Sequence, residues 1–403
     1  MSARTNSARP SPFRLALFWL GVQAVWGALL GISLQARTIE LVSSNAIVAY
    51  GRLAALGATT AAVVQILVGL ISDSRRREGS RRIEFYAIGA IGGSAAIAFF
   101  YEARTFVALI VAFVALQGAL NLAIGPYQAI IPDFVERARV GKASSWMAAL
   151  QSAGNAIGAL AASFIANAAA LAATLGGLLL VTCAATSAHA RGLPLRQSTE
   201  RTEPLRVTRP FVDLFVSRLL VYVGFFTLLS YLLFYVQSSL GEVALAAAKQ
   251  TTGILIVSFT IVGALGAAIA ARPSDRLDKR LVATFGAAGF ILALALFIET
   301  HALGLAIAAT VLAGVGWGVF LVADWAIACR ILPSGAMAAA MGVWNLAIVL
   351  PQIIAPALTT AVLALLRVTA GTAPPRIAFA LALGETLVGI AWLWRLSPAA
   401  IGD

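Results

Sequence analysis

The side chains of this chain that are best suited to bind a solute are amides, hydroxyls and aromatic rings that interrupt long apolar stretches. An amide can both donate and accept hydrogen bonds, and an aromatic face such as that of Trp317 gives a sugar ring an apolar surface. The candidate binding residues are Gln23, Trp26, Gln117, Asn121, Gln151, Asn155, Tyr222, Tyr231, Asn345 and Gln352. Amides also tie membrane helices together, through hydrogen bonds worth about 0.6–2 kcal/mol each. Because the set recurs at similar depth in both halves of the chain, we expect it to line a solute pathway.

Four charged residues lie inside apolar stretches, where an uncompensated charge costs at least about 2.5–3.5 kcal/mol. Glu385 is the deepest acid and Asp324 lies nearer one end of its stretch, so either could carry a proton. Asp324 could equally be a structural partner in a gate, and Glu385 could lie at the periphery. Arg218 can extend towards the membrane surface or pair with Asp213. We expect Arg52 to face a cavity or to pair across a gate.

These polar groups require elements that hold them inside a membrane. Of 403 residues, 60% are hydrophobic and 11% are charged, and the mean hydropathy is +0.91. A helix needs about 20 apolar residues to cross the ~30 Å hydrocarbon core. The predicted membrane-spanning helices cover residues 13–35, 47–71, 83–101, 105–131, 143–166, 168–190, 211–237, 247–271, 281–299, 302–329, 337–364 and 376–396. The predicted fold class is therefore an all-α membrane protein with twelve transmembrane helices.

Several functional classes are disfavoured by the rest of the composition. The net charge of +12 resides in the gaps between apolar stretches, which argues against nucleic-acid binding. Two cysteines and two histidines are too few and too scattered for a disulfide framework or a metal cluster. The sequence holds no phosphate-binding glycine loop with its lysine and no Ser-His-acid set. We therefore expect no enzymatic activity and no cofactor.

The basic residues predict the orientation of the chain in the membrane. Of 29 lysines and arginines, 22 lie in one alternating set of gaps, five lie in the other set, and Arg52 and Arg218 lie inside spans. Because cytoplasmic loops carry the excess of Lys and Arg, both termini are expected in the cytoplasm of a bacterial-type inner membrane. The basic start leads into a span of full length, so we expect an uncleaved first helix.

The chain divides into two similar halves. Residues 191–210 form the longest polar gap and are expected to be a cytoplasmic linker between a six-helix bundle over 1–190 and another over 211–403. An internal repeat supports this division. The matching positions are Ser72-Asp73 with Ser274-Asp275, and Trp146 with Trp344.

The gap after the second span resembles the signature of the major facilitator superfamily. It combines Gly69, which permits close helix packing, with Asp73 at the helix end and a basic run from Arg75 to Arg82. The resemblance implies two six-helix bundles that give alternating access to a central site. It also implies a gating role for Asp73, which could pair with a neighbouring helix and lock one conformation. The alternative is that the arginines only set the topology.

Shorter patches resemble the sucrose transporters and their glycoside–pentoside–hexuronide cation symporter relatives. These patches are Gly21-Val22-Gln23, Ser33-Leu34, Gln65 to Gly69, Gly125-Pro126, Gly154-Asn155 and Gly342 to Gln352. Sucrose transporters carry an acid one turn before the asparagine that Asn121 matches, whereas this chain has Gln117 there. An amide cannot exchange a proton, so the group's proton-coupling arrangement does not carry over.

Together these observations predict a secondary active transporter of a sugar or glycoside, coupled to a cation and most simply to H⁺. One alternative is an exporter of apolar or amphiphilic compounds. Another is a non-transporting membrane protein of the same fold that assembles or delivers other components. The expected partners are a small-molecule substrate and membrane lipid, without nucleic acid, and the expected state is a monomer.

Overall fold

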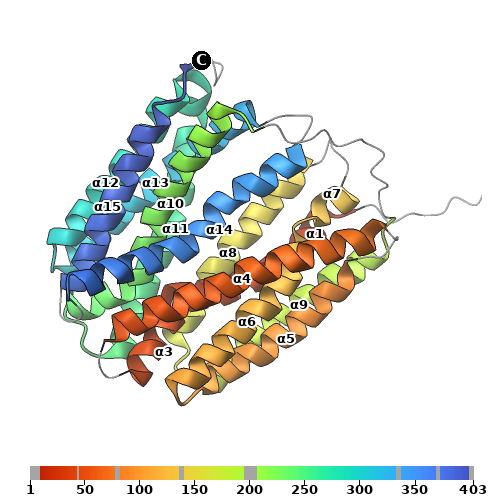
Figure 1. The fold of residues 1–403 in the computed structure, drawn as a ribbon, viewed down its shortest axis with the longest axis horizontal. Helices are drawn as coiled ribbons and strands as arrows, with labels where there is room; N and C mark the ends of the chain where they lie inside the picture. Colours follow the sequence, from red (N-terminus) through yellow and green to blue (C-terminus); the bar gives the residue numbers. More distant parts are fainter. Residues whose placement is uncertain are drawn as a thin grey trace, which may run out of the picture. The chain divides into compact units, whose positions relative to one another are not determined.

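The structure, a computed structural model, describes residues 10–42, 45–77, 82–135, 140–194, 207–332, 337–368 and 373–398. All the regular secondary structure in these ranges is helical (Figure 1). The elements are α1 (Pro12–Ala16), α2 (Phe18–Ala28), the π-helical turn η1 (Leu29–Ser33), α3 (Leu34–Leu41), α4 (Ala46–Arg77), α5 (Ile83–Glu102), α6 (Phe106–Tyr127), α7 (Ile130–Phe134), α8 (Val140–Phe164), α9 (Ala168–Arg191), α10 (Arg209–Ser238), α11 (Leu245–Arg276), α12 (Lys279–Glu299), α13 (Leu303–Ile331), α14 (Met337–Leu365) and α15 (Ala373–Leu393). The predicted all-α fold class is confirmed.

Eleven helical segments of the described chain are long and apolar enough to cross a membrane. They coincide with every predicted span except the fifth, which corresponds to α8. That helix is continuous over 25 residues, but Gln151, Asn155 and several serines and glycines lower its hydropathy. The fourth span is shorter than expected, because α6 ends at Tyr127 and the chain turns before α7 begins.

The first crossing segment is not a regular α-helix. Between α2 and α3 the chain passes through the wider turn η1. At the end of this turn the Ser33 hydroxyl is hydrogen bonded to the Tyr101 hydroxyl of α5 at 2.8 Å. Two residues later the Gln35 amide donates to the Leu30 carbonyl at 2.7 Å. Such π-turns are rare and frequently occur at functional sites.

The chain forms two compact units. One comprises Met1–Ser43 and Leu56–Thr199, and the other comprises Ser44–Ala55 and Glu200–Asp403. The second unit thus includes the first turns of α4. Most of the expected linker, residues 195–206, lies outside the described residues, and the bundle bounds expected from the sequence stay predictions.

In the first unit, glycines bring α2 and α8 into backbone contact. A Cβ atom on Gly158 would lie 1.9 Å from the Ala24 carbonyl oxygen, and one on Gly27 would lie 2.3 Å from the Asn155 carbonyl oxygen. Small residues at this spacing let membrane helices pack closely. Gln23 lies on α2 and Asn155 on α8. The close backbone contact between these helices therefore holds the two residues at a fixed separation.

In the second unit, glycines likewise allow close packing within two pairs of helices. A Cβ atom on Gly224 of α10 would lie 2.4 Å from the Thr386 hydroxyl of α15. A Cβ atom on Gly318 of α13 would lie 2.0 Å from the Gly263 carbonyl oxygen of α11. Small residues of α11 thus form a packing face against α13, and α15 is held against α10 beside Glu385.

Candidate functional site

A buried ion pair lies inside the second unit, between α10 and α13. The Arg218 guanidinium is hydrogen bonded to the Asp324 carboxylate, and the two side chains are only 4% and 3% exposed. A second guanidinium nitrogen donates to the Tyr222 hydroxyl at 3.2 Å. The guanidinium carbon lies 4.7 Å from the Tyr222 ring centroid and 4.2 Å from that of Trp344 on α14. Three helices therefore meet at one cation, which one carboxylate neutralises.

The prediction that Arg218 could pair with Asp213 is wrong. Asp213 instead accepts a hydrogen bond from the Trp392 indole at 3.1 Å and lies 3.6 Å from Arg395 and 3.9 Å from Arg209. Five residues along an α-helix rotate a side chain by about 140° relative to the first. Asp213 and Arg218 therefore point to different faces of α10, and each finds a partner elsewhere.

Next to Tyr222, aromatic side chains pack around Trp317. Phe225 stacks on the indole, with ring centroids 4.3 Å apart and an interplanar angle of 14°, and Tyr222 meets it at 5.0 Å. Phe290 and Phe320 complete this cluster at 5.6 and 5.7 Å. One face of the Trp317 ring, which the sequence suggested as a platform for a sugar, is therefore covered by Phe225.

Glu385 is half-buried where α15 contacts α10. The Thr227 hydroxyl donates to one carboxylate oxygen at 3.4 Å. The other oxygen is buried and has no hydrogen-bond partner within the part of the chain that the structure describes. With one hydroxyl neighbour and no ion pair to any described residue, this carboxyl group is chemically suited to take up and release a proton.

Tyr231 is fully buried within the second unit. Its ring lies 6.0 Å from that of Tyr50 on α4, and its hydroxyl is 3.4 Å from the Thr360 hydroxyl. Gly51 makes this approach possible, because a Cβ atom there would lie 1.6 Å from the Thr360 hydroxyl oxygen. The next residue, Arg52, is exposed and makes no ion pair within the described ranges.

The amides of the first unit fall into two groups. Gln117 and Asn121 are buried, and the Asn121 amide donates to the Gln117 side-chain oxygen at 3.2 Å and to its carbonyl at 2.9 Å. Gln23, Gln151 and Asn155 are half-buried, and their side chains make no hydrogen bond to any described residue. In the first group the two side chains are hydrogen bonded to each other, whereas the amides of the second group remain able to hydrogen bond to a solute.

For four other predicted site residues the structure shows few contacts or does not describe the side chain. Trp26 is half-buried on α2. Gln352 is half-buried on α14, and its amide donates to the Ile348 carbonyl at 3.2 Å. Asp73 and Asn345 belong to α4 and α14, but their side chains lie outside the described part of the structure.

Ion pairs also hold helix ends on the side where the basic gaps lie. In the first unit, Arg82 before α5 pairs with Asp133 of α7 at 3.0 Å. In the second unit, Asp278 accepts hydrogen bonds from the Arg280 guanidinium at 2.5 Å and from its backbone N–H at 2.8 Å. The hydrogen bonds from Arg280 hold the pKa of Asp278 below its usual value. Arg280 also donates to the Leu396 carbonyl at 2.7 Å, which links the start of α12 to the residues that follow α15.

Two features of the site were missed from the sequence. Trp344 marked the internal repeat but was not expected to cover Arg218. The hydrogen bond between Ser33 and Tyr101 had no sequence signal beyond two polar groups in different spans. As for metal binding, no group of three or more His, Cys, Asp or Glu side chains able to hold an ion occurs among the described residues.

The described part of the chain is thus a helical membrane protein whose apolar helices carry neutral amides, the ion pair of Arg218 and Asp324, Arg52 and Glu385. The chain belongs to the Major Facilitator Superfamily, whose family model matches residues 15–356. Membership of this superfamily makes the protein a multi-pass membrane transporter that binds small-molecule substrates, and not an enzyme.

The fold is similar to those of solved transporters. A bacterial homologue of the human lysosomal transporter Spinster, in an inward-facing and occupied conformation, matches over 95% of both chains with a TM-score of 0.75 and 15% identity. A D-xylose–proton symporter matches over 97% of this chain and 98% of its own, with a TM-score of 0.70 and 15% identity. The nucleoside transporter NupG matches over 96% and 99%, with a TM-score of 0.67 and 13% identity. At these identities the likeness concerns the fold, and a comparison with curated protein sequences found no match.

Proposed function

We propose that this protein moves a sugar or glycoside by alternating access, together with a cation, H⁺ in the simplest case. The observation that carries the proposal is the set of half-buried amides Gln23, Gln151 and Asn155, which have no partner among the described residues. Leaving a buried polar group unsatisfied costs about 1–3 kcal/mol, so such groups are expected to meet water or a polar ligand. Neutral donors and acceptors match the hydroxyl groups of a sugar.

Two resemblances support the substrate class. The sequence patches around Gln23 and Asn155 resemble the sucrose transporters and their glycoside–cation symporter relatives. The fold is also similar to that of a D-xylose–proton symporter, at 15% identity. Each is consistent with a carrier for a hydroxylated solute.

For the coupling residue we favour Glu385 over Asp324. Asp324 neutralises Arg218, so protonating it would leave a buried arginine without its counter-charge. Among the described residues Glu385 has the Thr227 hydroxyl as its one hydrogen-bond partner, so it can gain or lose a proton without breaking an ion pair there. Asp324 and Arg218 then serve as a structural clamp, and Asp73 and Arg52 as candidate gating residues.

The substrate class is tested by uptake of labelled sugars into proteoliposomes that contain the full chain. Q151A and N155A should lower the affinity for the transported sugar at least tenfold, while Q128A, an exposed amide at the end of α6, should behave as the wild type. Loss of transport in Q128A to the same degree would contradict the assignment. Flux of apolar or amphiphilic compounds without sugar flux would favour the exporter, and co-purification of a partner without any flux would favour the assembly role.

The coupling role is tested with E385Q, which keeps the shape and a hydrogen-bond acceptor for Thr227 but cannot ionise. We expect sugar exchange across the membrane to persist and accumulation driven by a pH gradient to disappear. Accumulation at the wild-type level in E385Q would show that another group carries the cation.

The orientation and assembly are also part of the proposal. We place both termini in the cytoplasm of a bacterial-type inner membrane, because of the distribution of lysines and arginines. We expect the halves 1–190 and 211–403, joined by the linker 191–210, to work as a monomer. Fusions of a compartment-sensitive reporter to the C-terminus test the orientation.

A further inference from the structure

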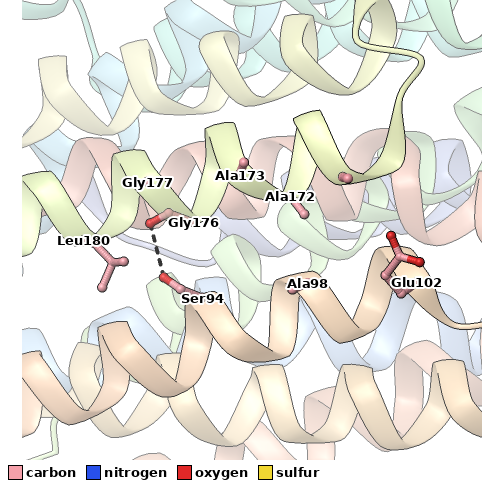
Figure 2. A pocket seen from close by; sticks show the side chains of 9 residues that line it. Ser94, Ala98, Glu102, Ala172, Ala173, Gly176, Gly177 and Leu180 are labelled. Carbon is pink, nitrogen blue, oxygen red and sulfur yellow. Dashed lines mark hydrogen bonds between the residues drawn. The ribbon is translucent and has the colours of Figure 1, made fainter.

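A groove of about 330 Å³ lies between α5 and α9 in the first unit. Its lining is almost entirely small and apolar, with Ala98 on one wall and Ala173 and Gly177 on the other. Figure 2 shows Glu102 at one end of the groove and Leu180 near the other. Its volume falls at the lower end of the range for ligand pockets.

A direct contact between the two helices lies near the deeper end of the groove. The Ser94 hydroxyl donates to the Gly176 carbonyl at 3.1 Å, as the dashed line in Figure 2 marks. Towards Glu102, alanine and glycine side chains are too small to fill the space between the helices. A Cβ atom on Gly177 would meet no atom within 4 Å.

The length of the groove matches one leaflet of a bilayer. Glu102 is the last residue of α5 and Ser94 lies eight residues earlier, which corresponds to about 12 Å at 1.5 Å per residue. That distance is a little less than half of the ~30 Å hydrocarbon core. A lipid chain that enters from the membrane surface therefore fits its depth.

The mouth of the groove carries a free negative charge. Glu102 is exposed and makes no hydrogen bond or ion pair with any described residue. A carboxylate there attracts a primary ammonium group and repels a headgroup that bears only a phosphate charge. The neighbouring exposed residues of the two helices include Val181 and Phe99, as expected for a surface that meets lipid.

We propose that this groove binds one acyl chain of phosphatidylethanolamine, with the lipid amine paired to Glu102. The inference does not depend on which solute the protein transports. In the orientation proposed above, the lipid belongs to the outer leaflet.

The test uses the full chain reconstituted in vesicles of equal parts phosphatidylethanolamine and phosphatidylglycerol with identical acyl chains. After extraction in mild detergent, the retained lipids are counted by native mass spectrometry. We expect the wild type to retain phosphatidylethanolamine over phosphatidylglycerol by roughly fivefold, the preference that one exposed ion pair can give. E102Q should retain both lipids equally, and G177L, whose side chain fills the groove, should retain at least fivefold less of either.

The control is G304L on α13, because Gly304 is also exposed and has open space around it. It should retain lipid as the wild type does. A98L fills the same groove from α5 and replaces G177L if that variant does not elute as a monodisperse protein. The proposal is overturned if both groove-filling variants retain lipid as the wild type does, if E102Q keeps the lipid preference, or if filling the groove changes only the oligomeric state.

Discussion

The ion pair between Arg218 and Asp324 gives the most quantitative prediction. D324L would leave the Arg218 guanidinium buried without a counter-charge, and R218M would leave the Asp324 carboxylate in the same position. Removing one partner of a buried pair typically costs about 3–5 kcal/mol. The two rings that cover Arg218 and the Tyr222 hydroxyl still stabilise the cation in D324L. We therefore expect a loss of about 3 kcal/mol in the free energy of unfolding for D324L, and somewhat more for R218M.

The double variant R218M/D324L distinguishes the interaction energy between the two charged groups from the effect of each group on its surroundings. Replacing a buried ion pair by apolar side chains of similar volume is often neutral, so the double variant should unfold within about 1 kcal/mol of the wild type. The assay is reversible unfolding of the purified protein in mixed micelles, followed by tryptophan fluorescence. D213N is the matched control and should cost at most about 1 kcal/mol, because its partners Arg209 and Arg395 are 81% and 46% exposed. If the two single losses simply add in the double variant, the two groups do not interact energetically and the reasoning fails.

Two further variants test packing and the loop ion pair. G158A should destabilise the protein by about 1–3 kcal/mol in the same unfolding assay, because the new methyl group would lie 1.9 Å from the Ala24 carbonyl oxygen, whereas G118A has open space and should be neutral or slightly stabilising. The hydrogen bonds that lower the pKa of Asp278 in the folded protein stabilise it above the unfolded-state pKa of about 4, and this stability is lost as the pH falls through the folded-state value. D278N should therefore lose less thermal stability than the wild type when the pH falls below about 4. The difference should be no more than about 1 kcal/mol, because the site is partly exposed. The same dependence of stability on acid pH in D278N and in the wild type would contradict this.

The helical scaffold was predictable because hydropathy is a local property of the chain. Stretches such as 168–190 and 302–329 are recognised by their apolar composition alone, and the structure has α9 and α13 there. The mutual hydrogen bond of Gln117 and Asn121 was also within reach, since residues four apart share a helix face. The shortened fourth span was not, because the turn after Tyr127 is not visible in a hydropathy pattern.

The pairing of intramembrane charges could not be predicted from the sequence. Arg218 and Asp324 are on different helices, and only tertiary packing decides that they meet. The nearest acid along the chain, Asp213, looked equally suitable and points to another face of α10. Trp344 had no local signal that linked it to Arg218, since stacking on a guanidinium depends on the arrangement of α10 and α14. For the same reason, the sequence could not show that Gln23 and Asn155 have no partner among the described residues while Gln117 and Asn121 are hydrogen bonded to each other.

The π-turn at Leu29–Ser33 has a consequence for how the first membrane segment tolerates changes in length. A π-turn holds about one residue more than the α-helical turn it replaces, so it acts as a stored insertion. Removing one residue within it should restore a regular helix while Ser33 still faces Tyr101 and α3 keeps its rotation. The same deletion in α2 would rotate everything beyond it by about 100° and turn Gln35 and Thr38 away from their buried positions. The turn is therefore the place where this helix can absorb a one-residue deletion without losing its register.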